Sequence, residues 1–271
     1  MKLVSIGVPV RNGATGIEAA LASLSQQTHR NVEIIVSDNA SDDDTVAIVA
    51  RAAALDARIR LIRQPKNIGM LGNFRAVLDA AVGDFFLWAA HDDARDADYI
   101  EKLLARLDET PDAVVAMGKI VTVLENRSTV IAPDPSTMGM NLRQRMRKTG
   151  RLAPFTLYGL WHVGVLRRIP MREAFWSADT PIILAAAAIG PFLHVPETRF
   201  IYRDTPKPFF RRPLAALCSI PVVIFNSYSA TAAVAGPYAG LLGAWHMLGV
   251  LWRQTHTFIA NRVRVPMPKS R

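Results

Sequence analysis

A hydrophobic run ends on adjacent carboxylates in residues 84–98, which read DFFLWAAHDDARDAD. His91, Asp92 and Asp93 follow the run directly, at the point where a strand would leave a sheet. Carboxylate oxygens are ligands that Mg²⁺ and Mn²⁺ prefer, so these residues are a candidate divalent-metal site. The plainer alternative is that the two aspartates cap the helix that follows.

Three more segments of polar or glycine-containing sequence follow predicted strands. The strands alternate with stretches that have apolar residues at helical spacing. This order predicts an α/β fold with a mainly parallel sheet flanked by helices, in which ligands bind beyond the carboxyl ends of the strands. The four strand ends are therefore expected to face one crevice. The strands are 3–10, 32–38, 59–64 and 84–90, and the first three exits are Arg11-Asn12-Gly13, Asp38-Asn39-Ala40-Ser41 and Asn67-Ile68-Gly69.

Two common nucleotide-binding motifs are missing from the sequence. No G-x-G-x-x-G turn follows the first strand, and no G-x-x-x-x-G-K-[ST] motif occurs, which disfavours a nicotinamide dehydrogenase and a P-loop NTPase. Further along the chain we expect a helix over 97–109, a strand over 113–124 and a mobile loop over 131–150. An apolar helix is expected to open at Asp179 and to lead into another strand.

Composition and cysteine content narrow the class of protein. Half of the 271 residues are hydrophobic and 20% are charged, as in a folded domain. The single cysteine, Cys218, excludes an internal disulfide and a multi-cysteine zinc site, and it fits a reducing compartment. The first residues, MKLVSIGVPVRNG, hold an apolar run that is too short and too alternating for a signal peptide.

The charge of the chain is unevenly distributed. Residues 1–112 carry 17 acidic and 12 basic residues, a net charge of −5, whereas residues 113–271 carry 6 and 20, a net charge of +14. Eight Lys or Arg residues and no acidic residue follow Asp204. This asymmetry fits a catalytic front half and a back half that meets an anionic partner. We expect an anionic membrane surface and no nucleic acid, because no aromatic-and-basic recognition module is present.

Four motifs in residues 3–204 together resemble the family 2 glycosyltransferases, which have the nucleotide-sugar-binding GT-A fold. In order, they resemble the first strand and its turn, the nucleotide-binding acidic loop, the helix leading to the metal-binding acids, and the helix that begins with the catalytic aspartate. The resemblance implies a metal-dependent, inverting transfer of a sugar from a UDP- or GDP-linked donor to a glycan or lipid-linked acceptor in cell-surface polysaccharide assembly. The motifs are VSIGVPVRNG, IIVSDNASDDDT, NIGMLGNFRAVLDAAVGDFFLWAAHDD and SADTPIILAAAAIGPFLHVPETRFIYR.

The resemblance also implies roles for single residues. Asp92 would bind Mg²⁺ or Mn²⁺, with Asp93 or His91 in support. Asp179 would be the general base that accepts the proton of the acceptor hydroxyl. The nucleotide-binding residues implied in the same way are Pro9, Arg11, Asn12, Asp38, Asn67, Gly69, Asn73 and His91.

The chain departs from the family pattern at two positions. Ala90 stands where an acid usually precedes the metal-binding pair, and Ala178 stands where Glu often precedes the catalytic Asp. The reduced acidic motif leaves a non-catalytic nucleotide-sugar-binding or scaffold protein as the alternative function. A retaining transferase of the same fold is a second alternative, and it would keep the anomeric configuration of the donor.

Several of these residues also have a purely structural interpretation. Asp38 suits an Asx turn, and Asn67-Ile68-Gly69 suits a tight turn. Asn73 is equally compatible with an exposed position on its helix. Asp179, followed by Thr180-Pro181, is a ready N-terminal cap, and a cap can also be a base.

Three further polar residues lie near the motifs. His162 and His194 each stand in apolar sequence, so we expect core positions for both and not metal ligation. Arg203 is open to either a diphosphate contact or a structural role.

The C-terminal part of the chain contains a long uncharged stretch. Residues 213–252 contain no Asp, Glu, Lys or Arg and have basic residues on both flanks. They suit either a transmembrane hairpin that turns at Gly236-Pro237, with cytoplasmic ends, or helices packed on the catalytic domain or lying in the membrane interface. We therefore expect a GT-A domain over 1–205 and a helical extension over 206–271, at the cytoplasmic face of the inner membrane or in the cytoplasm.

Overall fold

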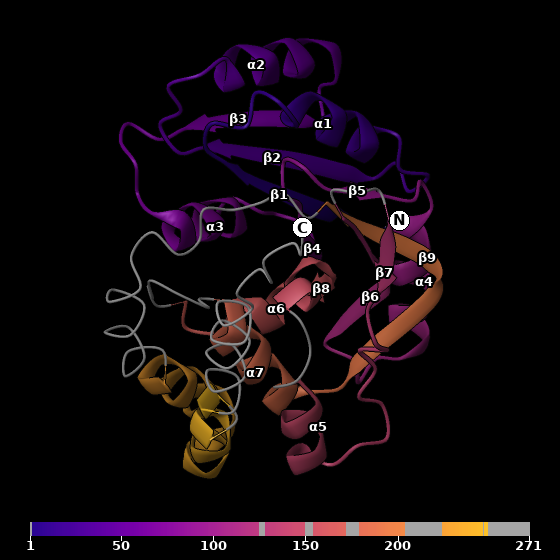
Figure 1. Ribbon diagram of the computed structural model, residues 1–271, viewed down its shortest axis with the longest axis vertical. Helices are drawn as coiled ribbons and strands as arrows, with labels where there is room; N and C mark the ends of the chain where they lie inside the picture. The colour runs from indigo at the N-terminus through magenta and orange to yellow at the C-terminus, as the bar shows by residue number, and fades with distance from the viewer. Residues whose placement is uncertain are drawn as a thin grey trace, which may run out of the picture.

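The computed structural model describes residues 2–124, 128–149, 154–171, 179–203, 224–245 and 247–248. These residues form a nine-stranded sheet with helices on both faces, which confirms the predicted α/β fold (Figure 1). The strand order is β3-β2-β1-β4-β8-β6-β9-β5, and β7 pairs with β6 outside this path.

The first four strands are parallel and place their carboxyl ends along one edge, as the sequence predicts. Their order is β3-β2-β1-β4. β2 and β3 therefore lie on one side of β1, and β4 lies on the other side. A crevice for a ligand is expected where the strand order reverses in this way. The strands are β1 (Val4–Val10), β2 (Val32–Asp38), β3 (Ile59–Arg63) and β4 (Phe85–Trp88).

The second half of the sheet mixes parallel and antiparallel pairs. β8 inserts antiparallel between β4 and β6, and the long β9 runs parallel to β6. The short β5, which directly follows the acidic residues, pairs antiparallel with the far end of β9. The strands are β5 (Ala94–Arg95), β6 (Val115–Val123), β7 (Thr129–Ile131), β8 (Leu160–His162) and β9 (Phe192–Arg203).

Two hydrophobic clusters, one on each face, hold the helices against the sheet. The first joins β1 and β2 to α1 (Ile17–Ser25), α2 (Thr45–Leu55) and α4 (Tyr99–Glu109). The second joins α3 (Met70–Asp79), α6 (Val163–Leu166) and α7 (Asp179–Ile189) to the other face. Residues 181–188 of α7 are all buried, because this helix is apolar around its whole circumference.

The prediction of a mobile loop over 131–150 is wrong for its second half. Residues Leu142–Thr149 form α5, a basic helix whose Met146 is fully buried against α7. The Arg145 side chain donates a 2.9 Å hydrogen bond to the carbonyl of Ala187 in α7. Local composition favours a loop here, but packing against α7 overrides it.

Residues 224–245 form a helical hairpin that turns at Gly236, whose φ is +84°. A methyl group on Gly243 would lie 2.6 Å from the Thr231 hydroxyl, and one on Gly240 would lie 2.8 Å from the Ala232 side chain. The two arms therefore pack closely and antiparallel through their small residues. Within the described part of the chain, no helix has the length and hydropathy needed to cross a bilayer.

Candidate active site

The loops that follow β1 and β2 are cross-linked by hydrogen bonds at the sheet edge. The backbone N–H of Asn12 donates to Ser41 Oγ at 2.9 Å, and Asp42 N–H donates to Asn12 Oδ1 at 3.1 Å. Asn12 and Ala40 both have positive φ, 54° and 55°, a conformation that costs energy in non-glycine residues. The bonds between the loops hold this strained geometry in place.

Asp38 and Asn73 lie buried at the end of β2, each with one unsatisfied oxygen. Asp38 Oδ2 accepts from the N–H of Ser41, three residues on, at 3.1 Å, whereas Asp38 Oδ1 has no partner among the described residues. Asn73 donates to the carbonyls of Val10 and Ser37, and its Oδ1 also has no partner in the described chain. Asn73 is only 3% exposed, so the exposed position considered for it is excluded.

Asn39 connects these residues to the loop after β3. Its amide donates to Asn67 Oδ1 and to the Gly69 carbonyl, both at 3.0 Å, and its Oδ1 accepts from Ile68 N–H. Asn67 Oδ1 also accepts from Gly69 N–H, so the predicted tight turn is present. Asn39 was not predicted from the sequence as a site residue, although it directly follows Asp38 at the end of a strand.

His91 brings the end of β4 against the loop after β1. A methyl group on Gly13 would lie 2.8 Å from the His91 ring, and one on Gly16 would lie 2.6 Å from the His91 carbonyl oxygen. These two glycines therefore permit the close approach of the two strand exits. The structure thus joins the β1, β2, β3 and β4 exits in one continuous loop cluster.

Asp92 and Asp93 differ in exposure and in role. Asp92 is partly exposed, whereas Asp93 is 4% exposed and accepts a long 3.4 Å hydrogen bond from Arg203 N–H in β9. The helix that follows begins at Tyr99 after Asp98, so neither Asp92 nor Asp93 is its cap.

Arg95 is a buried cation two residues beyond Asp93 that the sequence analysis did not select. It donates to the carbonyl of Trp88, the last residue of β4, at 2.8 Å. Its guanidinium lies 4.9 Å from the centre of the Phe200 ring. Burial lowers the pKa of Arg95, and the charge of nearby Asp93 opposes that shift. The Arg95 side chain therefore links the end of the loop that carries the acids to Trp88, the residue that precedes this loop.

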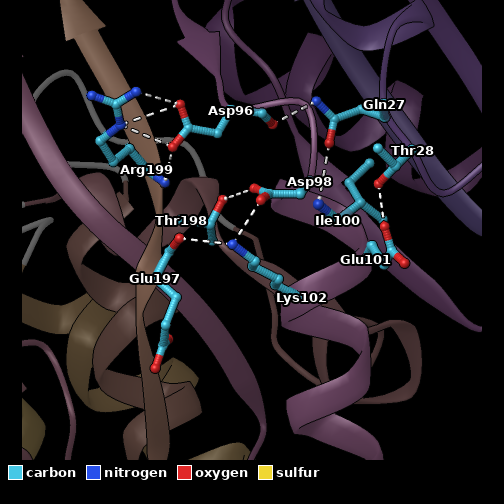
Figure 2. Close-up of polar contacts among 10 residues, drawn as sticks. All are labelled: Gln27, Thr28, Asp96, Asp98, Ile100, Glu101, Lys102, Glu197, Thr198 and Arg199. Atoms are coloured by element: carbon cyan, nitrogen blue, oxygen red, sulfur yellow. Dashed lines mark hydrogen bonds and ion pairs between the residues drawn. The ribbon is translucent and has the colours of Figure 1, made fainter.

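Figure 2 shows how the segment after the acids is bonded to β9 and to the residues that follow α1. Asp96 accepts hydrogen bonds from the Arg199 backbone N–H and guanidinium, with the closest at 2.9 Å. Asp98 accepts from Thr198 at 2.7 Å and pairs with Lys102 at 2.6 Å. On the other side, the Gln27 amide donates to the Asp96 carbonyl, and Thr28 donates to Glu101. We call Asp96, Asp98, Lys102, Thr198 and Arg199 the β9 clamp.

Asp179 is the first residue of α7, and Tyr158 connects it to the acids after β4. Asp179 Oδ1 accepts a 2.9 Å hydrogen bond from the N–H of the next residue, Thr180, at the start of the helix. Burial raises the pKa of Asp179, and hydrogen bonds at the helix start oppose that shift. Burial also raises the pKa of Tyr158, and the charges of Asp93, Asp179 and Asp92 raise it further. Tyr158, which sequence reasoning missed, is therefore influenced by the charges of all three carboxylates.

A divalent cation at Asp92 would need ligands beyond the protein side chains gathered there. Within the described residues, no group of three or more His, Cys, Asp or Glu side chains is gathered to hold a metal. Mg²⁺ is nevertheless often bound through one or two carboxylates, with substrate phosphates and water completing the shell. Asp92 supplies one such carboxylate at the sheet edge.

Pro9, Arg11, His162 and His194 are the other residues that were considered from the sequence. Pro9 is in β1 opposite Ser37, and Arg11 is exposed in the loop after it. His162 packs its ring 4.6 Å from the Phe85 ring, and the His194 Nδ1 lies 3.0 Å from Asp134. These contacts agree with structural roles for both histidines.

Comparison with known proteins identifies the class to which this fold and site belong. The family model described as glycosyl transferase family 2 matches residues 5–171, more than half of the chain. The chain therefore belongs to glycosyl transferase family 2. Its likeness to TarS of Staphylococcus aureus extends over 95% of this chain and 73% of that one, with a TM-score of 0.68 and 16% identity. This likeness shows the GT-A fold.

Most relatives with curated descriptions match less than half of this chain. The chain is 33% identical over 110 residues to a GalNAc(5)-diNAcBac-PP-undecaprenol beta-1,3-glucosyltransferase of Campylobacter jejuni, covering 40% of this chain and 36% of that protein. It is 25% identical over 247 residues to the uncharacterized glycosyltransferase EpsJ of Bacillus subtilis, covering 83% and 70%. For three other relatives, the chain spans only 38%, 32% and 42% of their length.

Proposed function

We propose that the chain is a metal-dependent, inverting glycosyltransferase that moves a hexose-type sugar from a nucleoside-diphosphate donor to a glycan or lipid-linked acceptor. The observation that carries the proposal is the loop cluster at the sheet edge, where Asp38 Oδ1 lies buried without a partner among the described residues and the carboxylates of Asp92 and Asp93 follow β4. A structure of TarS holds UDP-GlcNAc and shares this fold, with a TM-score of 0.66 over 86% of this chain and 71% of that chain. This likeness supports a UDP-linked donor.

The nucleotide would lie against Asp38, Asn73 and the Asn67–Gly69 turn. Asp38 Oδ1 is buried without a partner among the described residues, and such an oxygen costs free energy until it accepts a hydrogen bond. A pyrimidine N–H or a ribose hydroxyl is a suitable donor for that oxygen. Pro9, Arg11 and Asn12 border the same loop cluster and would contact the base.

Asp92 would hold Mg²⁺ or Mn²⁺ against the donor diphosphate, with Asp93 or His91 in support. When bound, the metal would act as a Lewis acid that stabilises the negative charge of the leaving diphosphate. Arg95 and the hydrogen bond from Arg203 would keep the loop that carries the acids in one position.

Asp179 would act as the general base toward the acceptor. The acceptor hydroxyl gives its proton to the Asp179 carboxylate while its oxygen forms a bond to the anomeric carbon. The bond from that carbon to the diphosphate oxygen breaks, and the electron pair leaves with the nucleoside diphosphate. One displacement of this kind inverts the anomeric centre, and one well-placed base contributes about 10²–10⁴-fold to the rate.

The test is turnover of a panel of UDP- and GDP-linked sugars with Mn²⁺, offered with lipid-linked and glycan acceptors. We expect release of nucleoside diphosphate and, by proton NMR of the glycoside, an anomeric configuration opposite to that of the donor. A product that keeps the donor configuration would replace the inverting step with a retaining one. Tight nucleotide-sugar binding with no turnover of any donor would favour the non-catalytic alternative.

We also propose that the chain works at the cytoplasmic face of the inner membrane. The supporting features are the uncharged helical hairpin and the excess of basic residues after Asp204. A lipid-linked acceptor would be held at the same surface.

A further inference from the structure

The helical hairpin presents a row of large apolar side chains to solvent. Tyr238, Leu241, Trp245 and Leu248 follow one another at intervals of three, four and three residues, which places them on one face of a helix. The exposed fractions of Tyr238, Leu241 and Trp245 are 62%, 63% and 71%. Phe225 on the other arm is also exposed. We call these five residues the apolar row.

The opposite side of the same hairpin is buried in the protein core. Ala239 and Met247 are fully buried, and with Ala230 they belong to the cluster formed around α7. The hairpin is thus fixed to the catalytic domain by one face, and the apolar row is the face that remains. Contiguous exposed apolar patches of this kind mark interaction sites in soluble proteins.

Basic side chains lie at the same end of the molecule. Figure 1 shows α5 and the yellow hairpin together at the end far from α2, with α7 next to both. Arg143 and Arg147 of α5 are exposed, and within the described chain neither forms an ion pair. Arg147 and Lys148 line a hollow of about 250 Å³ with Met140 and Gln144.

We propose that this end of the molecule, formed by the apolar row and the cations of α5, docks on an anionic phospholipid surface. Trp and Tyr are enriched at membrane interfaces, where an apolar ring and a polar tip are both accommodated. An apolar helix face inserts at the boundary of headgroups and acyl chains, and nearby Arg side chains bind anionic headgroups. The hairpin itself carries no charge that would have to be desolvated.

This inference deepens the proposed function by naming the surface that would bring the active site to a lipid-linked acceptor. The positive charge near the apolar row distinguishes between a protein partner and a lipid surface. A second protein would also cover an apolar row, but an anionic bilayer accounts for both the row and the exposed arginines at the same end of the molecule. In the sequence, eight basic residues and no acid follow Asp204, which adds positive charge to the C-terminal part of the chain.

The test is co-sedimentation of the full chain with vesicles of phosphatidylcholine alone and of equal parts phosphatidylcholine and phosphatidylglycerol. We expect binding to the anionic vesicles only, weakened by salt because salt screens the charges. The double variant Leu241→Ser/Trp245→Ser should reduce affinity by about tenfold or more, since the inserted apolar area is lost. Arg143→Gln and Arg147→Gln should each reduce it by about fivefold.

Matched controls lie on α2, at the other end of the molecule. Leu55 is 90% exposed and Arg51 is exposed, so Leu55→Ser and Arg51→Gln remove the same kinds of group and should leave binding unchanged. Titration of every variant with UDP shows that it is folded and that the active site is separate from vesicle binding. Equal binding by the apolar-row variants and the wild type would overturn the proposal. A wild-type dimer that the double variant converts to a monomer, without vesicle binding by either, would also overturn it.

Discussion

At the residue scale, the Asp38 carboxylate is the group best suited to accept a hydrogen bond from a ligand. One of its oxygens closes the loop through Ser41 N–H, and the other is buried and has no partner among the described residues. We predict that Asp38→Asn weakens UDP binding by about tenfold, because a hydrogen bond to a charged acceptor contributes ~1.5–3 kcal/mol. Calorimetric titration measures this, and exposed Asp42→Asn in the same loop is the control that should change nothing.

Asp179 is the residue whose loss should separate catalysis from binding. We predict that Asp179→Asn lowers kcat by about 10²–10⁴-fold while nucleotide affinity stays the same, because the variant keeps the shape and loses the base. Undiminished kcat in Asp179→Asn would remove Asp179 from the mechanism.

The pH profile supplies an independent test of the same residue. Burial raises the pKa of Asp179 above its ordinary value near 3.8, and the base acts only when it is deprotonated. The rate of the wild-type enzyme should therefore rise with pH through a pKa above that value. A rate that stays constant down to the ordinary aspartate range would contradict the assignment.

At the element scale, the start of α3 depends on the backbone conformation of Gly69. Its φ of 80° and ψ of 166° lie in a region that only glycine adopts readily. We predict that Gly69→Ala costs about 1–3 kcal/mol of stability and weakens nucleotide binding, because the turn with Asn67 and Asn39 must distort. Gly72→Ala, one turn along the same helix with ordinary van der Waals contacts, should be neutral or stabilising. Denaturant unfolding of both variants makes the comparison.

The β9 clamp should hold the segment that follows Asp92 and Asp93 against β9. Asp96→Ala removes the acceptor for the Arg199 guanidinium and backbone N–H, next to the residues where β5 pairs with β9. We predict a loss of about 1 kcal/mol in stability together with weaker metal-dependent nucleotide binding. The exposed pair Arg75–Asp79 is the contrast, since Asp79→Ala should cost only ~0.3–0.5 kcal/mol and leave binding unchanged. Binding that survives Asp96→Ala intact would show that the clamp serves stability alone.

At the scale of the whole molecule, the sequence was informative where local pattern and tertiary structure agree. The four parallel strands, their exits and the helix at Asp179 follow from apolar runs and turn residues, so they were predicted near their observed bounds. Insertion of β8 between β4 and β6 was not predictable, because a three-residue strand carries too little periodicity. α5 was missed because its basic composition hides Met146, the apolar residue that is fully buried against α7.

The same limit applies to the site. Asp38, Asp92 and Asp179 carried signals because each stands at the end or start of a clear element. Arg95 and Tyr158 carried none, because their importance arises only when β9 and the segment before β8 fold back over the acid loop.

We propose that the acidic residues after β4 hold a metal that helps to bind a nucleoside diphosphate. The most direct measurement is isothermal titration of the full chain with UDP and GDP, with Mn²⁺ and with a chelator, for the wild type, Asp92→Ala and the surface control Asp112→Ala. We predict that nucleoside diphosphate binding requires Mn²⁺, is lost in Asp92→Ala and is retained in Asp112→Ala. Binding of equal affinity with and without metal, unchanged in Asp92→Ala, would contradict it and would reduce His91-Asp92-Asp93 to a turn.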